Sequence, residues 1–259
     1  MADTVLITGA SGGIGYELSK LFAANGDNLI LIARNGNKLE LFKTELEKQH
    51  RISVMVIAKD LSENGAVPEV FNKVSAAGWT ADILVNNAGF GDFGSFSSCD
   101  WNKQHAMVQL NILALMQMTK LFLPGMVKNR KGKILNIASI AAFQPGPYMA
   151  TYYASKAFVL SFSEALATEL KKSGVTVTAV CPGPTKTGFS EAADLGSSKL
   201  FSSLKNATAE EVAAFSYKAL MKGKPVAIPG LMNRVLVFGQ RFLPRSAVRA
   251  MVARIQGNA

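Results

Sequence analysis

Tyr152 and Lys156 are spaced for acid–base chemistry on a carbonyl or an alcohol. They are four residues apart in a segment of helical period, so their side chains share one face, one turn apart. A free phenol has a pKa of about 10 and is a poor base at neutral pH, but a nearby ammonium stabilises the phenolate and lowers that pKa. The pair therefore predicts a tyrosine that donates or accepts a proton. Ser139, at the end of a predicted strand, is expected to donate a hydrogen bond to the substrate oxygen.

A glycine cluster near the amino end predicts a binding loop for a dinucleotide. It follows a short apolar strand, opens an amphipathic helix and reads Thr8-Gly9-Ala10-Ser11-Gly12-Gly13-Ile14-Gly15. Gly9 permits a tight turn, Gly13 lets the backbone approach a pyrophosphate, and Gly15 lets the helix pack closely on the sheet. The helix N-terminus then presents unpaired N–H groups to the phosphates. A simple turn is the alternative, and the strand–loop–helix placement favours the dinucleotide.

The end of the second predicted strand bears on which dinucleotide is bound. An acidic residue there would hydrogen-bond the adenosine ribose and favour NAD(H). The chain has Ala33 followed by Arg34, whose guanidinium suits bidentate contact with a 2′-phosphate. We therefore expect NADP(H) to be preferred over NAD(H). A solvated arginine is the alternative, and Gly12 stands where a basic residue would have given a second phosphate contact.

The other reactive side chains indicate no competing site. His50 and His105 lie in helical segments away from the strand ends, and the spacing of Cys99 and Cys181 fits neither a disulfide framework nor a metal site. We expect no metal. Two free thiols are typical of a reducing cytoplasm.

Short apolar runs alternate with longer segments of helical period along the chain. The predicted strands are Val5–Thr8, Asn28–Ala33, Ser53–Ala58, Ile83–Asn86, Lys133–Ser139, Val175–Cys181 and Pro225–Ile228. The predicted helices between them are Ile14–Asn25, Asn37–His50, Val67–Ala77, Trp101–Lys128, Thr151–Ser173 and Ala209–Met221. This alternation predicts an α/β doubly wound Rossmann fold, a seven-stranded parallel sheet with helices on both faces. Ligands of such sheets bind beyond the carboxyl ends of the strands.

These motifs, in this order and at these intervals, resemble the classical short-chain dehydrogenase/reductase family along nearly the whole chain. The glycine loop is similar to the family's TGxxxGxG motif, and Asn86-Asn87-Ala88-Gly89 to its NNAG motif. The resemblance implies a catalytic set of Asn111, Ser139, Tyr152 and Lys156. In the family, this asparagine kinks a helix and holds a proton-relay water beside the lysine, which also binds the nicotinamide ribose.

The resemblance also implies which residues contact the cofactor. They are Gly9, Ser11, Gly12, Gly13, Ile14, Gly15, Arg34, Asn35, Asp60, Leu61, Asn87, Ala88, Gly89, Tyr152, Lys156, Pro182, Gly183, Thr185 and Thr187. Tyr153 is the nearest rival of Tyr152, but it stands three residues before the lysine, and the four-residue spacing favours Tyr152.

We expect the substrate to bind near residues 184–207. In the family, the corresponding segment forms a lid over the substrate. Candidate pocket residues are Phe90, Phe93, Ala141, Phe143, Tyr148, Phe189 and Leu195, although some of them can equally be plain core. They predict a small hydrophobic carbonyl substrate without naming it: an oxoacyl chain, a steroid-like ketone and an aliphatic ketone stay open. The stretch Phe90–Gly94 is similar to that of 3-oxoacyl reductases and hydroxysteroid dehydrogenases.

The sequence therefore predicts an NADP(H)-dependent oxidoreductase that moves a hydride between nicotinamide and a hydrophobic carbonyl or alcohol. The alternative is a catalytically idle NADP(H)-binding regulator or scaffold, because fold does not imply chemistry. A dehydratase or epimerase is a rival among enzymes. The complete catalytic set favours the oxidoreductase.

The carboxyl end of the chain is strongly basic. Residues 212–259 include eight Lys and Arg and no acid, so this part carries most of the formal net charge of +10. We expect residues 1–230 to form the catalytic domain and 231–259 to extend it with helices Leu231–Gln240 and Arg245–Gln256. Two interpretations stay open. These helices cap the pocket or pack on a subunit, or they form a basic amphipathic surface for a lipid bilayer or an acidic acyl carrier.

The remaining expectations concern assembly and location. We see no signal peptide and no run of about 18 apolar residues, so we expect a cytoplasmic protein, at most peripheral to a membrane. No nucleic-acid partner is expected. Apolar positions on the helices that carry Asn111 and Tyr152 exceed what one buried face absorbs and predict a homodimer or homotetramer; they are Leu110, Leu113, Leu115, Phe158, Phe162 and Leu166.

Overall fold

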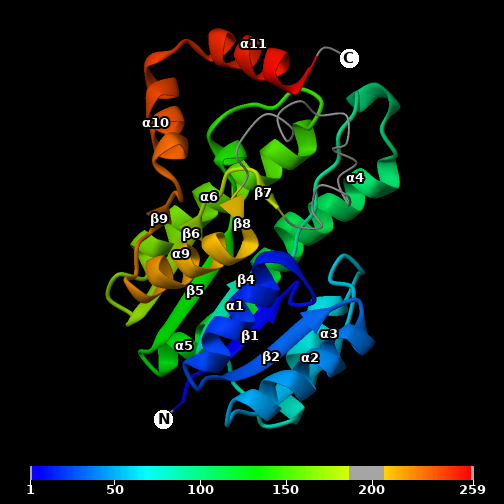
Figure 1. Cartoon of the computed structure of the whole chain (residues 1–259), viewed down its shortest axis with the longest axis vertical. Helices are drawn as coiled ribbons and strands as arrows, with labels where there is room; N and C mark the ends of the chain where they lie inside the picture. The colour runs from blue at the N-terminus through cyan, green and yellow to red at the C-terminus, as the bar shows by residue number, and fades with distance from the viewer. Residues whose placement is uncertain (1, 187–206, 258–259) are drawn as a thin grey trace.

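The fold is centred on a parallel sheet that runs through the whole molecule (Figure 1). A computed structural model describes residues 2–186 and 207–257 of the chain. The seven strands of this sheet are β1 (Thr4–Thr8), β2 (Asn28–Ala33), β3 (Val54–Ala58), β4 (Ile83–Asn86), β5 (Gly132–Ile137), β6 (Val175–Val180) and β9 (Val226–Ala227). Their order in the sheet is β3-β2-β1-β4-β5-β6-β9. The predicted Rossmann fold is confirmed, with strand ends that differ from the prediction by one or two residues.

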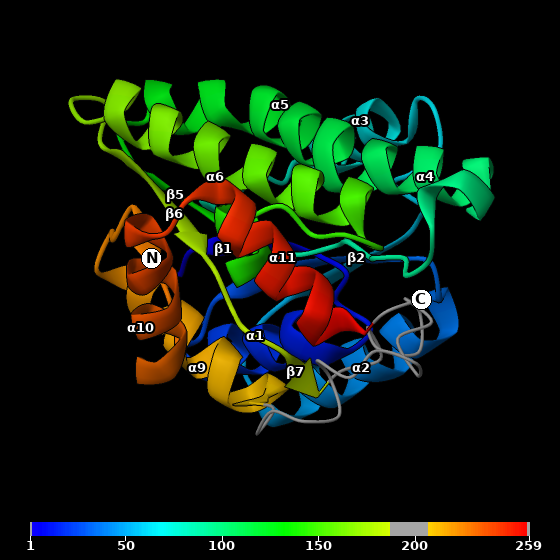
Figure 2. The same cartoon turned by 90° about the horizontal axis from the view of Figure 1, so that it is seen from above.

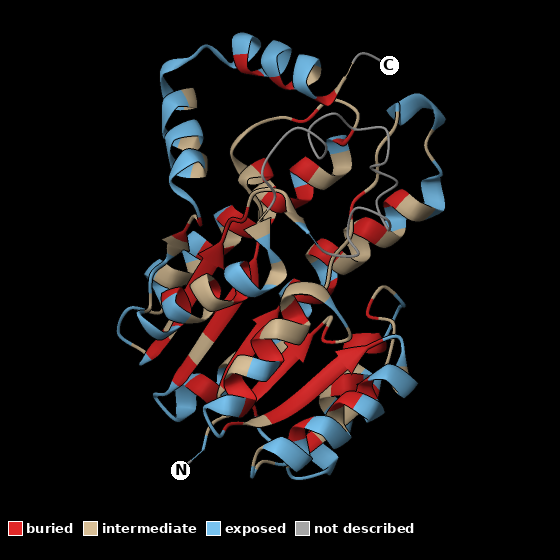
Figure 3. Cartoon of the chain, in the orientation of Figure 1, coloured by how far each residue is buried: buried red, intermediate tan, exposed pale blue. Residues whose placement is uncertain are grey.

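Helices cover both faces of this sheet (Figure 2). On one face lie α1 (Gly13–Ala24), α2 (Gly36–Gln49) and α9 (Ala209–Met221), and on the other α3 (Ala66–Ala76), α5 (Leu115–Lys128) and α6 (Ala150–Glu169). Successive strand residues feed the two cores in turn: Val5 and Ile7 pack on the first face and Leu6 on the second. The strands β1 and β2 carry unbroken runs of buried apolar residues, Val5–Ile7 and Leu29–Ala33, because both of their faces are buried (Figure 3).

The predicted helix over residues 101–128 is interrupted in its middle. It consists of α4 (Trp101–Val108), a π-helical turn (Gln109–Ala114) and α5. A π-turn inserts an extra residue into the helical ladder and re-aims the side chains around it, often at a functional site. Asn111 lies in this turn and is 2% exposed. The family resemblance had implied an irregularity of the helix at this asparagine, and the π-turn lies there.

The same segment corrects one expectation drawn from the sequence. By length and composition, Trp101–Lys128 is apolar enough to cross a membrane, although the sequence had indicated no such run. Its residues Met118, Phe122 and Met126 are buried in the core that α5 and α3 share with the sheet. We interpret it as a core helix, because such helices pass the same test of composition.

Two differences from the predicted elements concern the end of α6 and a pair of short strands. The helix α6 ends at Glu169, four residues before the predicted end, because the chain turns back at Gly174 with a φ of +80°. Two-residue strands, β7 (Thr185–Lys186) and β8 (Ala207–Thr208), pair in parallel at the two ends of segment 187–206. A two-residue strand is too short to show the alternating or apolar pattern by which strands are predicted from a sequence.

The carboxyl-terminal helices extend beyond the carboxyl ends of the strands. The helix α10 (Leu231–Gly239) rises from the sheet, a 3-10 turn (Gln240–Phe242) follows, and α11 (Arg245–Gln256) crosses over the body (Figures 1 and 2). The two predicted helices are present, with the break at Pro244. Val248 and Val252 are buried on the inner side of α11.

Exposed apolar side chains on the helical layer that contains α3, α5 and α6 lead to a prediction of self-association. Leu113 and Met116 are exposed, whereas Leu115, expected to join them, is buried in the core. Two copies that pair through this layer would cover the exposed side chains. We expect light scattering at micromolar concentration to show a dimer or tetramer, and the double variant Leu113→Lys/Met116→Lys to lower the molar mass toward that of a monomer.

The matched control for this experiment is Leu41→Lys, since Leu41 is exposed on the opposite layer of helices. This control should keep the wild-type mass. A wild-type monomer at micromolar concentration would contradict the prediction.

Candidate active site

The glycine loop is held in place by the end of the neighbouring strand β4. Asn87 donates from Nδ2 to the carbonyl oxygens of Thr8 (2.9 Å) and Gly9 (3.3 Å), and its backbone N–H donates to Thr8 Oγ1 (3.0 Å). Gly9 has a φ of +67°, and a Cβ on Gly9 or Gly15 would lie 2.8 or 2.5 Å from Asn87 Nδ2. Only glycine fits at these two positions, because the loop and the asparagine pack directly against each other.

The start of α1 is suited to binding an anion. Gly12 is its N-cap, no side chain caps its first N–H groups, and its first turn carries no acid. The amide groups and the partial positive charge of the helix end are therefore available to phosphate. These residues fit the pyrophosphate of a dinucleotide.

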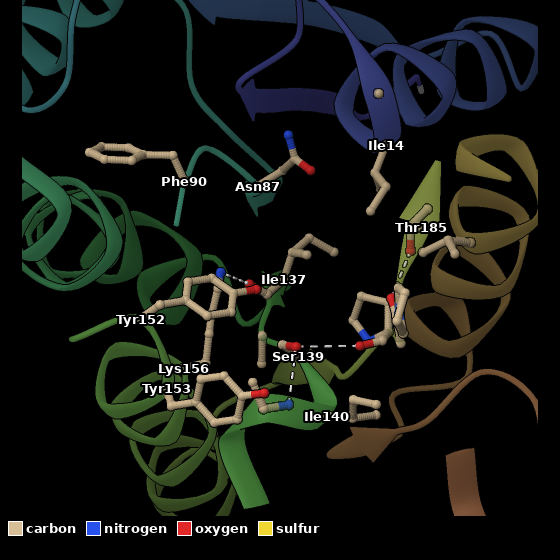
Figure 4. Close-up of a pocket in the computed structure, with 18 of the residues that line it drawn as sticks. Ile14, Asn87, Phe90, Ile137, Ser139, Ile140, Tyr152, Tyr153, Lys156 and Thr185 are labelled. Atoms are coloured by element: carbon tan, nitrogen blue, oxygen red, sulfur yellow. Dashed lines mark hydrogen bonds between the residues drawn. The ribbon is translucent and has the colours of Figure 1, made fainter. Parts of the chain in front are cut away.

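Tyr152, Lys156 and Ser139 face one cavity (Figure 4). Tyr152 and Lys156 lie one turn apart on α6, and Lys156 Nζ is 5.8 Å from the centroid of the Tyr152 ring. Lys156 Nζ donates to the carbonyl oxygen of Ile137 at the end of β5 (2.9 Å). Ser139 follows this strand, and its Oγ accepts from the backbone N–H of Ala141 (3.1 Å).

Asn111 connects the π-turn to the helix of Tyr152. Its Nδ2 donates to the carbonyl oxygen of Phe90 (2.9 Å) and to Ser155 Oγ (3.1 Å), and its Oδ1 accepts from the backbone N–H of Phe90. Ser155 Oγ in turn donates to the carbonyl oxygen of Tyr152 (2.7 Å). This chain of hydrogen bonds fixes α6 relative to the segment that follows Gly89.

Burial sets the electrostatics of the site. It raises the pKa of Tyr152 above its ordinary value, against a smaller lowering by the side-chain hydrogen bond with Ser139. It lowers the pKa of the Lys156 ammonium to about 8. The sequence had predicted a lowered pKa for the Tyr152 phenol. For the chain by itself this direction is wrong, because the cost of burying the phenolate outweighs its stabilisation by neighbouring groups.

The rival tyrosine is occupied by another contact. Tyr153 is buried, and its hydroxyl oxygen accepts a hydrogen bond from Gln256 Nε2 on α11 (2.7 Å). This bond secures α11 above the cavity. Tyr152, in contrast, lies beside Lys156 and Ser139, as the spacing had predicted.

Several basic side chains lie at or near the end of the cavity beside the glycine loop. Arg34 is largely exposed, with Nη1 3.9 Å from Asp60 Oδ2. Lys38, which the sequence analysis did not single out, has its Nζ 4.0 Å from the point where a Cβ on Gly12 would lie. Lys38 thus places an amine near Gly12 from the neighbouring helix α2. Lys59, also in the lining, pairs with Glu63 and Glu69.

Most of the predicted site residues line one cavity of about 1990 Å³. Predicted residues in the lining are Gly9, Ser11, Gly12, Gly13, Ile14, Arg34, Asn35, Asp60, Leu61, Asn87, Ala88, Gly89, Phe90, Ser139, Ala141, Tyr152, Lys156, Pro182, Gly183 and Thr185. Gly15 and Asn111 lie behind it and support it. Thr187, Phe189 and Leu195 lie outside the described residues. Within the described part of the chain, no cluster of His, Cys, Asp and Glu could hold a metal ion.

Three predicted pocket residues are not in this lining. Phe143, at the end of a 3-10 turn (Ile140–Phe143), packs against the cluster beneath α6, and the turn directs Ile140 and Ala141 to the cavity instead. The ring of Tyr148 packs near that of Phe93, with centroids 6.1 Å apart. Tyr148 has a φ of +64°, and the next residue, Met149, lines the cavity in its place.

Comparison with known proteins decides the family. Residues 3–198 match the family model described as short chain dehydrogenase. This chain belongs to the short-chain dehydrogenase family. It is also 30% identical over 261 residues to the rat (Rattus norvegicus) protein named dehydrogenase/reductase SDR family member 7B, a match that covers 96% of this chain and 80% of the relative.

Other relatives in the family are longer proteins. A very-long-chain 3-oxoacyl-CoA reductase from Phaeosphaeria nodorum is 36% identical over 179 residues, a match that covers 68% of this chain and 52% of the relative. A bovine protein of the same name is 34% identical over 187 residues, which is 70% of this chain and 59% of that protein. The chain thus spans about half the length of the first curated relatives that it matches.

A solved structure of a short-chain dehydrogenase from Sphingobium yanoikuyae in complex with NADPH is similar along the whole chain. It is 28% identical with a TM-score of 0.84, and the match covers 99% of this chain and 98% of the other. A bulky-bulky ketone specific alcohol dehydrogenase from Comamonas testosteroni is 28% identical with a TM-score of 0.77, covering 93% of this chain and 99% of the other.

The carboxyl-terminal helices contribute cavity residues that the sequence analysis had not named one by one. Apolar side chains of α10 and α11 line the cavity, among them Leu231, Val235, Val248, Val252 and Ile255. The helical period had predicted amphipathic helices and had left open whether they cap the pocket, pack on a subunit or face an anionic surface. The interpretation that they cap the pocket is supported by these contacts. The only earlier signal was the apolar rhythm itself.

Proposed function

We propose that this chain is an NADP(H)-dependent oxidoreductase that reduces long or bulky apolar carbonyl compounds or oxidises the matching alcohols. The observation that carries the proposal is that Tyr152, Lys156 and Ser139 line the same cavity as the glycine loop. A pyrophosphate bound at the start of α1 places the rest of the dinucleotide along the carboxyl ends of the strands. The cofactor then lies between the loop and Tyr152.

The chain's own residues supply the proton and the orientation. When bound, the nicotinamide supplies or accepts the hydride. In the reducing direction Ser139 Oγ donates a hydrogen bond to the carbonyl oxygen, and Tyr152 donates its phenolic proton to the same oxygen as charge develops there. The Lys156 ammonium stabilises the phenolate that remains. A raised phenol pKa keeps Tyr152 protonated before the reaction, which suits an acid.

The preference for NADP(H) is part of this proposal. Arg34 lies at the cavity edge with an exposed guanidinium, and Lys38 places an amine near Gly12. Two cations in this region favour a 2′-phosphate over a ribose hydroxyl. The relative from Sphingobium yanoikuyae was solved in complex with NADPH, which agrees with this choice.

The substrate class is proposed from the cavity walls and from the relatives' names. Apolar side chains from several separate segments surround the reacting side chains, including Phe90, Ile140, Met149, Val248 and Val252. Such walls bind alkyl surface and few polar groups. Relatives named for very-long-chain 3-oxoacyl-CoA and for bulky ketones point the same way.

A direct test is NADPH oxidation against a panel of carbonyl compounds. The panel should compare 3-oxoacyl thioesters of increasing chain length and bulky ketones with small polar ketones. We expect kcat/KM to rise with apolar surface. If NADPH binds and no member of a broad panel is turned over, the chain is the idle NADP(H)-binding protein that the sequence left open.

The pH dependence of reduction follows from Lys156. Burial lowers its pKa to about 8, so its ammonium predominates below that pH and is lost above it. Tyr152 stays protonated over this range because its pKa is raised. We therefore expect kcat/KM for reduction to be level below pH 8 and to fall above it, since this parameter reports the groups of the free enzyme.

The control is Lys156→Arg, whose guanidinium keeps its charge at every accessible pH. Its residual activity should show no fall near pH 8. A wild-type profile that stays level up to pH 10 would contradict the role given to the lysine.

A further inference from the structure

The helix α10 is apolar, and much of its apolar surface is exposed in the described part of the chain. None of its residues is buried, and Leu231 and Phe238 are 77% and 59% exposed. The 3-10 turn that follows adds Phe242, which is 74% exposed. An isolated helix of this length is marginal in water, and large apolar patches mark surfaces that bind something. The exposed apolar side chains therefore favour a partner that covers this end of the molecule.

The charge around these side chains has one sign. Arg241, Arg245, Arg249 and Arg254 are all exposed, and none of them forms an ion pair within the described residues. No acidic residue follows Glu211 in the chain. Each of the four arginines adds a positive charge, and no acidic residue nearby in the sequence neutralises it. The partner is therefore expected to be anionic.

We propose that α10, the turn Gln240–Phe242 and α11 form a docking face for an anionic lipid bilayer. Basic amphipathic helices bind such interfaces by burying apolar side chains among the acyl chains while their cations meet the headgroups. A second copy of the chain fits less well, because a two-fold contact through this face would bring the same arginines together. Figure 3 shows α10 and the outer side of α11 exposed at one end of the molecule.

The docking face and the cavity share the same helices. Leu231, Val235 and Ile255 line the cavity, whereas Phe238 and Phe242 do not. The rings of these two phenylalanines pack edge to face, with centroids 5.3 Å apart. Docking through the two phenylalanines would thus place the rim of the cavity at the lipid surface. An apolar carbonyl compound dissolved in the bilayer then reaches the site without crossing water, a consequence that rests on the proposed function.

The test is sedimentation of the full chain with vesicles, with and without about one third anionic phosphatidylglycerol, at low and high salt. The wild type should bind only the anionic vesicles, and salt should weaken the binding. Each basic residue near such a surface contributes about fivefold to partitioning, so Arg245→Gln/Arg249→Gln should bind about 25-fold less tightly. The variant Phe238→Ser/Phe242→Ser should also lose binding, because its apolar anchor is gone.

The matched control is Lys48→Gln/Lys128→Gln. It lowers the net charge equally, at exposed positions near the carboxyl-terminal ends of α2 and α5, far from the docking face. It should bind like the wild type. The proposal is overturned if the wild type does not bind at low salt, if this control loses as much as the arginine variant, or if Phe238→Ser/Phe242→Ser instead dissociates a dimer in light scattering.

Turnover of a water-soluble ketone separates this proposal from the proposed function. Phe238→Ser/Phe242→Ser should keep that turnover, because neither side chain lines the cavity. A chain that binds anionic vesicles but never oxidises NADPH would leave the docking face standing and refute the reductase.

Discussion

Replacement of Tyr152 by Phe is expected to lower kcat for reduction by at least about 100-fold, the usual worth of general acid–base catalysis. The change keeps the ring and its packing on α6 and removes only the hydroxyl that donates the proton. NADPH affinity should stay close to that of the wild type, because the glycine loop and Arg34 are untouched. Steady-state kinetics with a bulky ketone and a fluorescence titration with NADPH measure the two quantities.

The neighbouring tyrosine provides the control. Tyr153→Phe removes a buried hydroxyl from the same turn of the same helix, and with it the hydrogen bond from Gln256. We expect it to lower stability rather than the chemical step, since that hydroxyl contacts α11. If Tyr152→Phe retains half of the wild-type kcat, or if Tyr153→Phe is the variant that loses activity, the assignment of the proton donor is wrong.

Replacement of Arg34 by Ala is expected to raise the Kd for NADPH by about 10- to 100-fold, the range for a charge-assisted contact to phosphate. The Kd for NADH should barely change, because that cofactor lacks the 2′-phosphate. Lys38→Ala should give a smaller effect in the same direction, since its amine lies beside Gly12. Titration of both cofactors against each variant measures the preference.

Arg51→Ala is a suitable control for this titration, because Arg51 is exposed and follows α2 near the amino ends of the strands. It should leave both affinities unchanged. Equal binding of NADPH and NADH by the wild type would refute the predicted preference.

The sequence predicted those features in which residue type and local geometry are tightly coupled. Strands such as β1 and β2 are apolar at every inner position because helices cover both faces, and this pattern identifies them without a structure. The four-residue spacing of Tyr152 and Lys156 likewise fixes their shared helical face. Gly9 and Gly15 were predictable in the same way, because a side chain at either position would clash with Asn87.

What the sequence did not predict depends on contacts between distant segments. The hydrogen bond from Gln256 to Tyr153 joins residues 103 positions apart, and no local pattern indicates it. The exchange of Tyr148 for Met149 in the cavity wall depends on one residue with a positive φ. The pKa of Tyr152 moved opposite to the prediction because burial is a property of the whole fold.

The most direct test of the account follows the hydride itself. NADPH that carries deuterium at the transferable C4 position of the nicotinamide is incubated with the protein and a bulky apolar ketone, and the alcohol is analysed by mass spectrometry. The account predicts one deuterium on the carbinol carbon, formed in equal amount to the NADP⁺ and nearly abolished by Tyr152→Phe. Tight NADPH binding with no deuterated alcohol from any apolar carbonyl compound would contradict it.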